Sequence, residues 1–224
     1  MNRFYLKELD ELRNHFLLMA ENSIQAVTDA IEALRDCDVG KAQSVREKDD
    51  IIDQLEVDID AEASRYLTLR APVASDVRLI TVALKTSHDL ERIGDEASSI
   101  AKRTLRLAEN ASVLDLGSIL RMADLAVANI REAIDSLLDG DAERATGVPR
   151  KDKEIDILNR ENYERFLGKI TANPELASAY MELVFVSKSL ERIGDHAANI
   201  AQEIVFLLTG RDIRHTEVVK RSLL

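Results

Sequence analysis

The sequence is poor in the residues that interrupt helices. Its 224 residues include eight glycines, three prolines and no tryptophan. An all-β fold needs many more glycines and prolines for its turns. Aromatic residues make up only 4% of a chain that is 46% hydrophobic, so leucine, alanine, isoleucine and valine must fill the core. This composition favours an all-α fold of packed helices.

Other scarce features narrow the classes of function. A single cysteine, Cys37, excludes an internal disulfide and a thiolate zinc site. The net charge of −11 argues against nucleic-acid binding, which needs an excess of lysine and arginine, and against attachment to an anionic membrane. The sequence has no apolar run of about 18 residues and no signal peptide. We therefore expect a cytoplasmic protein without membrane insertion.

Short breaker segments divide the chain into six long segments with helical periodicity. Within a segment, apolar residues such as Ile52, Leu55 and Ile59 recur at steps of three and four. Short connections make successive helices antiparallel. The pattern predicts two tandem three-helix bundles, residues 1–110 and 111–224, with one continuous six-helix stack as the alternative. The breakers are "DCDVG" (36–40), Pro72, "ENASVLDLG" (109–117), "DGDAERATGVP" (139–149) and "TANP" (171–174).

The two halves carry related sequences. "LERIGDEASSIA" (90–101) returns as "LERIGDHAANIA" (190–201), 100 positions later. "KDDIID" (48–53) returns as "KDKEID" (151–156), 103 positions later. The three-residue difference falls in the turns, where insertions are tolerated. The chain is therefore predicted to contain an internal repeat of one three-helix unit.

Acidic pairs four residues apart recur at matching places in both halves. Such a pair lies on one face of a helix, one turn apart. Antiparallel pairing would bring two pairs together in each half, where four carboxylates repel unless they are protonated or neutralised by cations. Oxygen ligands suit magnesium, calcium, manganese or iron. The predicted ligands are Asp49, Asp53, Glu91 and Asp95 in the first half and Asp152, Asp156, Glu191 and Asp195 in the second.

Each half also has a glycine inside its acidic motif. Gly94 and Gly194 each cost about 1 kcal/mol relative to alanine in a helix. Such a glycine either allows close helix packing or leaves space beside a ligand.

Asn199 offers a further ligand oxygen in the second half, where the first half has Ser99. The neighbouring side chains that could support the ligands are His88, Arg92, Arg192 and His196.

No catalytic arrangement is visible in the sequence. It lacks a glycine-rich phosphate loop and a supported nucleophile–histidine pair. The Glu-x-x-His signature of di-iron bundles is missing from the acidic motifs. We therefore expect a protein that is not an enzyme. The alternatives are a metal-dependent helical-bundle enzyme and a structural adaptor whose acids form salt bridges.

Three long stretches resemble the PhoU family of accessory and regulatory proteins of high-affinity phosphate transport. They are "RFYLKELDELRNHFLLMAENSIQAV", "APVASDVRLITVALKTSHDLERIGDEASSIAKR" and "SLERIGDHAANIAQEIVFLLTGRDIRH". The resemblance implies two three-helix bundles. It also implies that the eight acidic residues above bind a multinuclear metal cluster. Iron is the metal it favours, with manganese, magnesium, calcium or zinc as alternatives.

The resemblance further implies a regulatory role. The family acts as a cytoplasmic adaptor between the phosphate ABC transporter and a sensor histidine kinase, and it holds the phosphate-starvation response off when phosphate is plentiful. The implied partners are the ATPase subunit of the transporter and the PAS region of the kinase. A homodimer is also implied.

Overall fold

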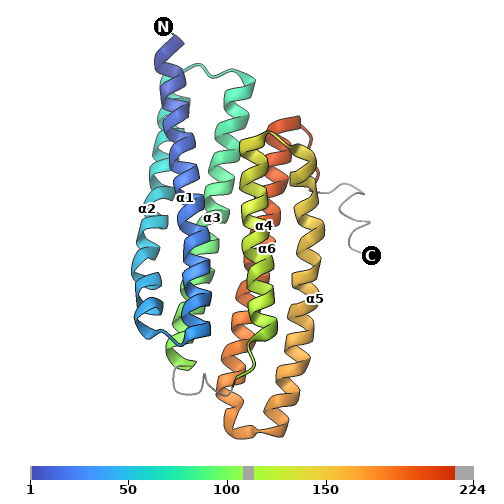
Figure 1. The fold of residues 1–224 in the computed structure, drawn as a ribbon. Coiled ribbons are helices and arrows are strands. Elements are labelled where there is room, and N and C mark those ends of the chain that lie inside the picture. The colour runs from blue at the N-terminus through green and yellow to red at the C-terminus, as the bar shows by residue number, and fades with distance from the viewer. Residues whose placement is uncertain (1, 108–113, 215–224) are drawn as a thin grey trace.

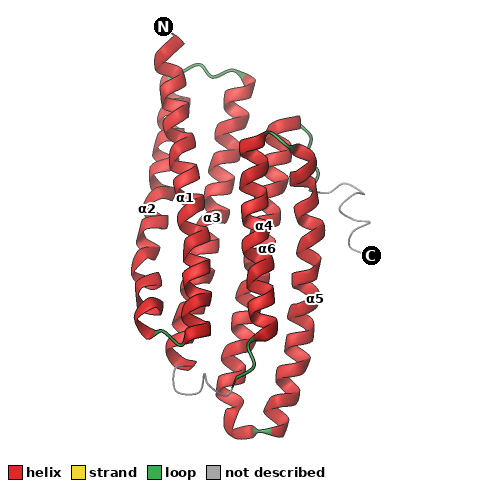
Figure 2. Cartoon of the chain, viewed as in Figure 1, coloured by secondary structure: helices red, strands yellow, loops and turns green. Residues whose placement is uncertain are grey.

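The chain folds into long helices, as seen in a computed structural model that describes residues 2–107 and 114–214 (Figure 1). All regular secondary structure in these residues is helical, which confirms the all-α prediction (Figure 2). The predicted boundary between residues 110 and 111 lies outside the described residues. The elements are α1 (Asn2–Asp36), α2 (Val39–Leu69), α3 (Ala74–Leu107), α4 (Gly117–Asp139), α5 (Ala142–Ala172), a short 3-10 turn (Pro174–Leu176) and α6 (Ala177–Thr209).

The six helices form two three-helix bundles that lie side by side. Helices α1, α2 and α3 pack on one another, and so do α4, α5 and α6. In Figure 1 the first bundle runs from blue to green and the second from yellow-green to red. Helix α3 packs against α6, and α1 packs against α4, so one continuous apolar core spans both bundles. The predicted tandem bundles are confirmed, and their closely packed junction gives them a shared core.

Equivalent residues of the two halves occupy equivalent places in the core. Met19 of α1 and Met122 of α4, which are 103 positions apart, are both fully buried. Ile93 of α3 and Ile193 of α6, which are 100 positions apart, are fully buried as well. Burying each such side chain stabilises the fold by about 1.5–3 kcal/mol. The repeat seen in the sequence is therefore a repeat of packing.

Helix α5 begins earlier than predicted. The expected turn over residues 139–149 was wrong beyond Asp141, because α5 starts at Ala142 and contains Pro149. The Asp141 carboxylate caps the helix by accepting a hydrogen bond of 2.9 Å from the backbone N–H of Arg144. Proline removes one backbone donor from the helix and disfavours it locally. The cap, together with the burial of Ala145 and Val148 on the core side, outweighs that cost.

The outer helices α2 and α5 bring the acidic motifs to matching places. Helix α2 packs along α3, and α5 packs along α6. The first acidic seam consists of Asp49 and Asp53 of α2 and Glu91 and Asp95 of α3. The second acidic seam consists of Asp152 and Asp156 of α5 with Glu191 and Asp195 of α6.

Candidate metal centre

Three carboxylates converge in the second acidic seam. Asp152, Asp156 and Asp195 each offer an oxygen atom, and these atoms all lie within 4.8 Å of one another. Asp152 is only 7% exposed, and its Oδ1 atom has no hydrogen-bond partner within the part of the chain that the structure describes. A buried carboxylate oxygen without a partner costs free energy, so its position calls for a neutralising group.

Burial and mutual repulsion shift the pKa values of this seam upward. Burial, followed by the charges of Asp195, Asp156 and Glu191, raises the pKa of Asp152 to about 7. The pKa values of Asp156 and Asp195 are also raised, by burial first and then by the charge of Glu191. The seam therefore resists holding all of its charges at neutral pH unless a cation or a proton compensates them.

Glu191, the fourth predicted ligand of this seam, has a partner of its own. Lys188, one helical turn before it, places Nζ 2.5 and 2.6 Å from its two carboxylate oxygens. Glu191 still acts electrostatically on Asp152, but its oxygens do not belong to the group of three. Of the four acidic residues predicted as ligands in this half, three are brought together and one is held by a lysine.

The glycine of the repeated motif provides the space for Asp152. A Cβ atom built on Gly194 would lie 2.2 Å from Asp152 Oδ1 and 3.0 Å from Ile155 Cδ1. In the first half, a Cβ on Gly94 would lie 2.9 Å from Ile52 Cδ1. Each glycine therefore allows close helix packing, and Gly194 also makes room for the buried carboxylate.

The first acidic seam is arranged differently. Arg92 lies between its two α3 acids, with Nε 3.2 Å from Glu91 Oε2 and a second nitrogen 3.0 Å from Asp95 Oδ2. Burial raises the pKa values of Asp49, Asp53 and Glu91, although the Ser98 hydroxyl opposes the shift at Asp49. The arginine thus already compensates part of the charge that a cation would compensate in the second seam.

A three-donor group of another composition lies one turn further along the same helices. Oxygen atoms of Glu56 and Glu91 and a ring nitrogen of His88 lie within 4.8 Å of one another. His88 Nδ1 is 3.2 Å from Glu56 Oε1. Glu56 was not among the ligands predicted from the sequence. Its place three residues after Asp53, on the same helical stripe, was the signal that could have found it.

Three other predicted residues face the junction between the halves. His196 Nδ1 lies 2.8 Å from Asp89 Oδ1, and the Asn199 amide donates to the same oxygen over 3.4 Å. Arg192 donates to Glu96 over 2.9 Å. These contacts join α3 to α6. A role of Asn199 as a ligand stays a prediction.

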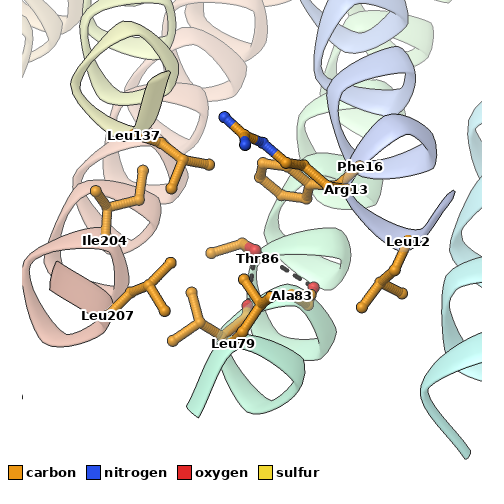
Figure 3. A pocket seen from close by; sticks show the side chains of 10 residues that line it. Leu12, Arg13, Phe16, Leu79, Ala83, Thr86, Leu137, Ile204 and Leu207 are labelled. Atoms are coloured by element: carbon orange, nitrogen blue, oxygen red, sulfur yellow. Dashed lines mark hydrogen bonds between the residues drawn. The ribbon is translucent and has the colours of Figure 1, made fainter. Parts of the chain in front are cut away.

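A separate apolar pocket of about 220 Å3 lies between the bundles (Figure 3). Side chains from α1, α3, α4 and α6 line it, among them Phe16, Leu79 and Leu137. Arg13 is its charged residue, and the Thr86 hydroxyl already donates to the Val82 carbonyl over 2.7 Å. This lining presents no carboxylate, imidazole or thiol, so the acidic seams are the stronger candidates for ligand chemistry.

Across residues 2–107 and 114–214, no helix is both long and apolar enough to cross a membrane.

Fold and site together define a class of protein, a duplicated three-helix bundle with an acidic seam in each half. Comparison with known sequences gives the family. The PhoU domain matches this chain twice, over residues 16–104 and 119–204. The chain belongs to the PhoU family.

Named relatives and solved structures cover almost the whole chain. A "Phosphate-specific transport system accessory protein PhoU homolog" of Pseudomonas aeruginosa is 39% identical over 93% of this chain and 86% of that protein. The homolog of the same name from Caulobacter vibrioides is 38% identical over 93% of this chain and 91% of that protein.

The structural matches agree with this assignment. The crystal structure of PhoU from Pseudomonas aeruginosa superposes with a TM-score of 0.89 at 38% identity, over 92% of this chain and 100% of that one. The crystal structure of the phosphate transport system regulatory protein PhoU from Streptococcus pneumoniae superposes with a TM-score of 0.86 at 28% identity. The match covers 93% of this chain and 99% of that one.

Proposed function

We propose that this protein regulates phosphate uptake and phosphate-starvation signalling as a metal-binding adaptor that is not an enzyme. The names of its relatives support a role in phosphate transport. The proposed partners are the ATPase subunit of the phosphate ABC transporter and the PAS region of a sensor histidine kinase. The protein would act in the cytoplasm, as a homodimer, and would hold the starvation response off when phosphate is plentiful.

One observation carries the metal part of the proposal: the buried, unpartnered Oδ1 atom of Asp152 within the group of three carboxylates. The donors are all oxygen atoms, which suits iron, manganese, magnesium or calcium. Asp152, Asp156 and Asp195 would hold the ions of a multinuclear cluster, with Glu191 available if Lys188 moves away. Iron is the metal we propose.

Bound cations would supply positive charge that neutralises the clustered carboxylates. The residues of the chain do the rest: Gly194 keeps the space open, and burial keeps water away from Asp152. Loading would convert a repelling seam into a compensated one and so change how a partner docks beside it. Metal-free and metal-loaded protein should therefore differ in affinity for the ATPase subunit, and equal affinities would contradict this mechanism.

A different role for the first seam has its own support. Arg92 donates a hydrogen bond to Asp95 and forms an ion pair with Glu91 without a hydrogen bond. We propose that this half binds metal more weakly than the second. Its acids would then act mainly as salt-bridged contacts of the adaptor.

Replacement of Gly194 by alanine tests the second seam. The new Cβ would displace the Asp152 carboxylate, so Gly194→Ala is expected to weaken Mn2+ binding about tenfold, as loss of a supporting contact typically does. Gly94→Ala is the matched control, because its Cβ would press on the flexible end of Ile52 at 2.9 Å and would stand at an ordinary contact distance of 3.4 Å from Asp49 Oδ1. Competition titration with a metal-sensitive dye measures both affinities. An unchanged affinity in Gly194→Ala would contradict the assignment.

Deletion of the gene in the native host tests the regulatory role. In medium rich in phosphate, we expect alkaline phosphatase or transporter expression to rise. Restoring the wild-type chain should return expression to its starting level. Unchanged expression after deletion would contradict the proposed function.

A further inference from the structure

Beyond the second acidic seam, the contact line between α5 and α6 opens into a groove of about 410 Å3. Tyr163 of α5 and Phe185 of α6 line this aromatic groove and are 59% and 45% exposed. Leu167 and Met181, one turn beyond each on the same helix faces, are 53% and 44% exposed. Large exposed apolar side chains gathered along one groove indicate an interaction surface.

The internal repeat provides a comparison for this surface. The positions of α2 that match Tyr163 and Leu167 hold Asp60 and Ser64. On α3, Thr81 and Lys85 stand where α6 has Met181 and Phe185. The first half folds into the same three-helix bundle with these four polar residues. The apolar side chains are therefore not needed to form the bundle.

The groove also has features of a prepared binding site. The Arg103 guanidinium carbon lies 4.2 Å from the centroid of the Phe185 ring, which restricts the ring before a partner arrives. Arg160 and Lys188 give the lining two positive charges, against the single negative charge of Glu164. Aromatic residues and arginine are the groups most enriched at interface centres.

We propose that the aromatic groove binds an amphipathic helix of a partner protein. The apolar side chains of that helix would contact Tyr163 and Phe185, and a carboxylate beside them would meet Arg160. A groove between two packed helices accepts a third helix through side chains at steps of three and four. A second copy of this chain fits less well, because a two-fold contact would place the basic groups of both grooves together.

The position of the groove links docking to the acidic seam. Lys188 lines the groove and also binds Glu191 of the second acidic seam. A cation bound at the seam would compete with Lys188 for Glu191. The lysine would then be free for a carboxylate of the docked helix. This inference rests on the proposed function, since it supplies the surface through which an adaptor would hold a partner.

The double variant Tyr163→Asp/Phe185→Lys tests the inference, because it installs residues that the first half already carries at these places. Binding of the purified ATPase subunit and the kinase PAS region is measured by calorimetry with the full chain. We expect at least one partner to lose affinity about 30-fold, as loss of two central anchors would produce. Val57→Asp, at an exposed position of α2 outside the groove, is the matched control and should leave both affinities unchanged.

Three results would count against the groove. Partner affinities within about threefold of wild type in the correctly folded double variant would overturn the inference and leave the proposed function standing. Conversion of a dimer to a monomer without loss of partner affinity, seen by sedimentation, would show that the groove joins two copies instead. Failure of the wild-type chain to bind either partner would contradict the proposed function itself, and with it the inference.

Discussion

Metal-free protein is expected to lose stability as the pH rises from about 4 to about 7, and Asp152→Asn should remove most of that loss. Asp152 has a pKa of about 7 in the folded state, against 3.8 for an ordinary aspartate. The folded state therefore holds more protons than the unfolded state within this window, so its stability falls as the pH rises. A shift of this size corresponds to about 4 kcal/mol at most. Asparagine keeps the shape and has no proton to lose.

Urea unfolding in EDTA at pH 4.5, 6 and 8 measures the effect. The raised pKa values of Asp49, Asp156 and Asp195 act in the same direction. Glu8 acts oppositely, because Arg70 lowers its pKa from 4.5, so it adds stability as the pH rises through the more acidic range. Asp49→Asn is the matched control with a smaller expected change. If the unfolding free energy of Asp152→Asn fell with rising pH as steeply as that of the wild type, the role given to this carboxylate would be contradicted.

Ile59 and Asn162 occupy equivalent buried positions of the two halves. Replacing each by the residue of the other should lower the stability of the protein by unequal amounts. Ile59 is fully buried, and Ile59→Asn is expected to destabilise the protein by about 3 kcal/mol through lost packing and an amide with too few partners. In the second half the equivalent Asn162 accepts a hydrogen bond from Ser118 and donates to Ser187 over 3.1 Å. Asn162→Ile should cost about 1–2 kcal/mol, because those hydroxyls keep other partners.

Thermal and urea unfolding of the two exchanged variants decides this point. The polar network around Asn162 continues through Ser187, whose hydroxyl donates to Asn159 over 2.8 Å. In the first half the Ser87 hydroxyl already donates to the Leu84 carbonyl over 3.0 Å. Equal destabilisation by Ile59→Asn and Asn162→Ile would show that the network is not specific to the second half.

Periodicity and duplication were sufficient to predict the fold. Steps of three and four within each segment identify helices, and two offsets near 100 show that one bundle is repeated. The start of α5 was missed because Pro149 outweighed two weaker signals. These were the capping residue Asp141 and the buried positions Ala145 and Val148, which only the packed structure reveals.

The sequence was sufficient to predict which helix faces carry the acidic residues. It was not sufficient to predict which of their oxygen atoms contact one another. Helical spacing places two acids on one face of each helix, which holds for any rotation of that helix. Which oxygens converge depends on side-chain rotamers and on neighbouring charges. Lys188 donates hydrogen bonds to Glu191, whereas Arg92 forms only an ion pair with Glu91. Helical spacing alone left both outcomes open.

The difference between the halves was expected from Ser99 and Asn199. In the structure, the Asn199 amide contacts Asp89 at the junction of the halves. The clearer difference between the seams is the burial of the aspartate on the outer helix, since Asp152 is 7% exposed. Its equivalent Asp49 is only partly buried. An unpartnered buried oxygen occurs in both seams among the described residues, at Asp152 Oδ1 and at Glu91 Oε2.

Elemental analysis of untagged protein purified without chelator tests the central claim most directly. Wild-type protein, Asp152→Asn/Asp156→Asn and Asp49→Asn/Asp53→Asn are compared after identical preparation. We predict bound metal in the wild type, loss of most of it in the second-half variant, and retention of most of it in the first-half variant. Wild-type protein without bound metal, or equal metal content in all three proteins, would contradict the claim that the second acidic seam is a metal centre.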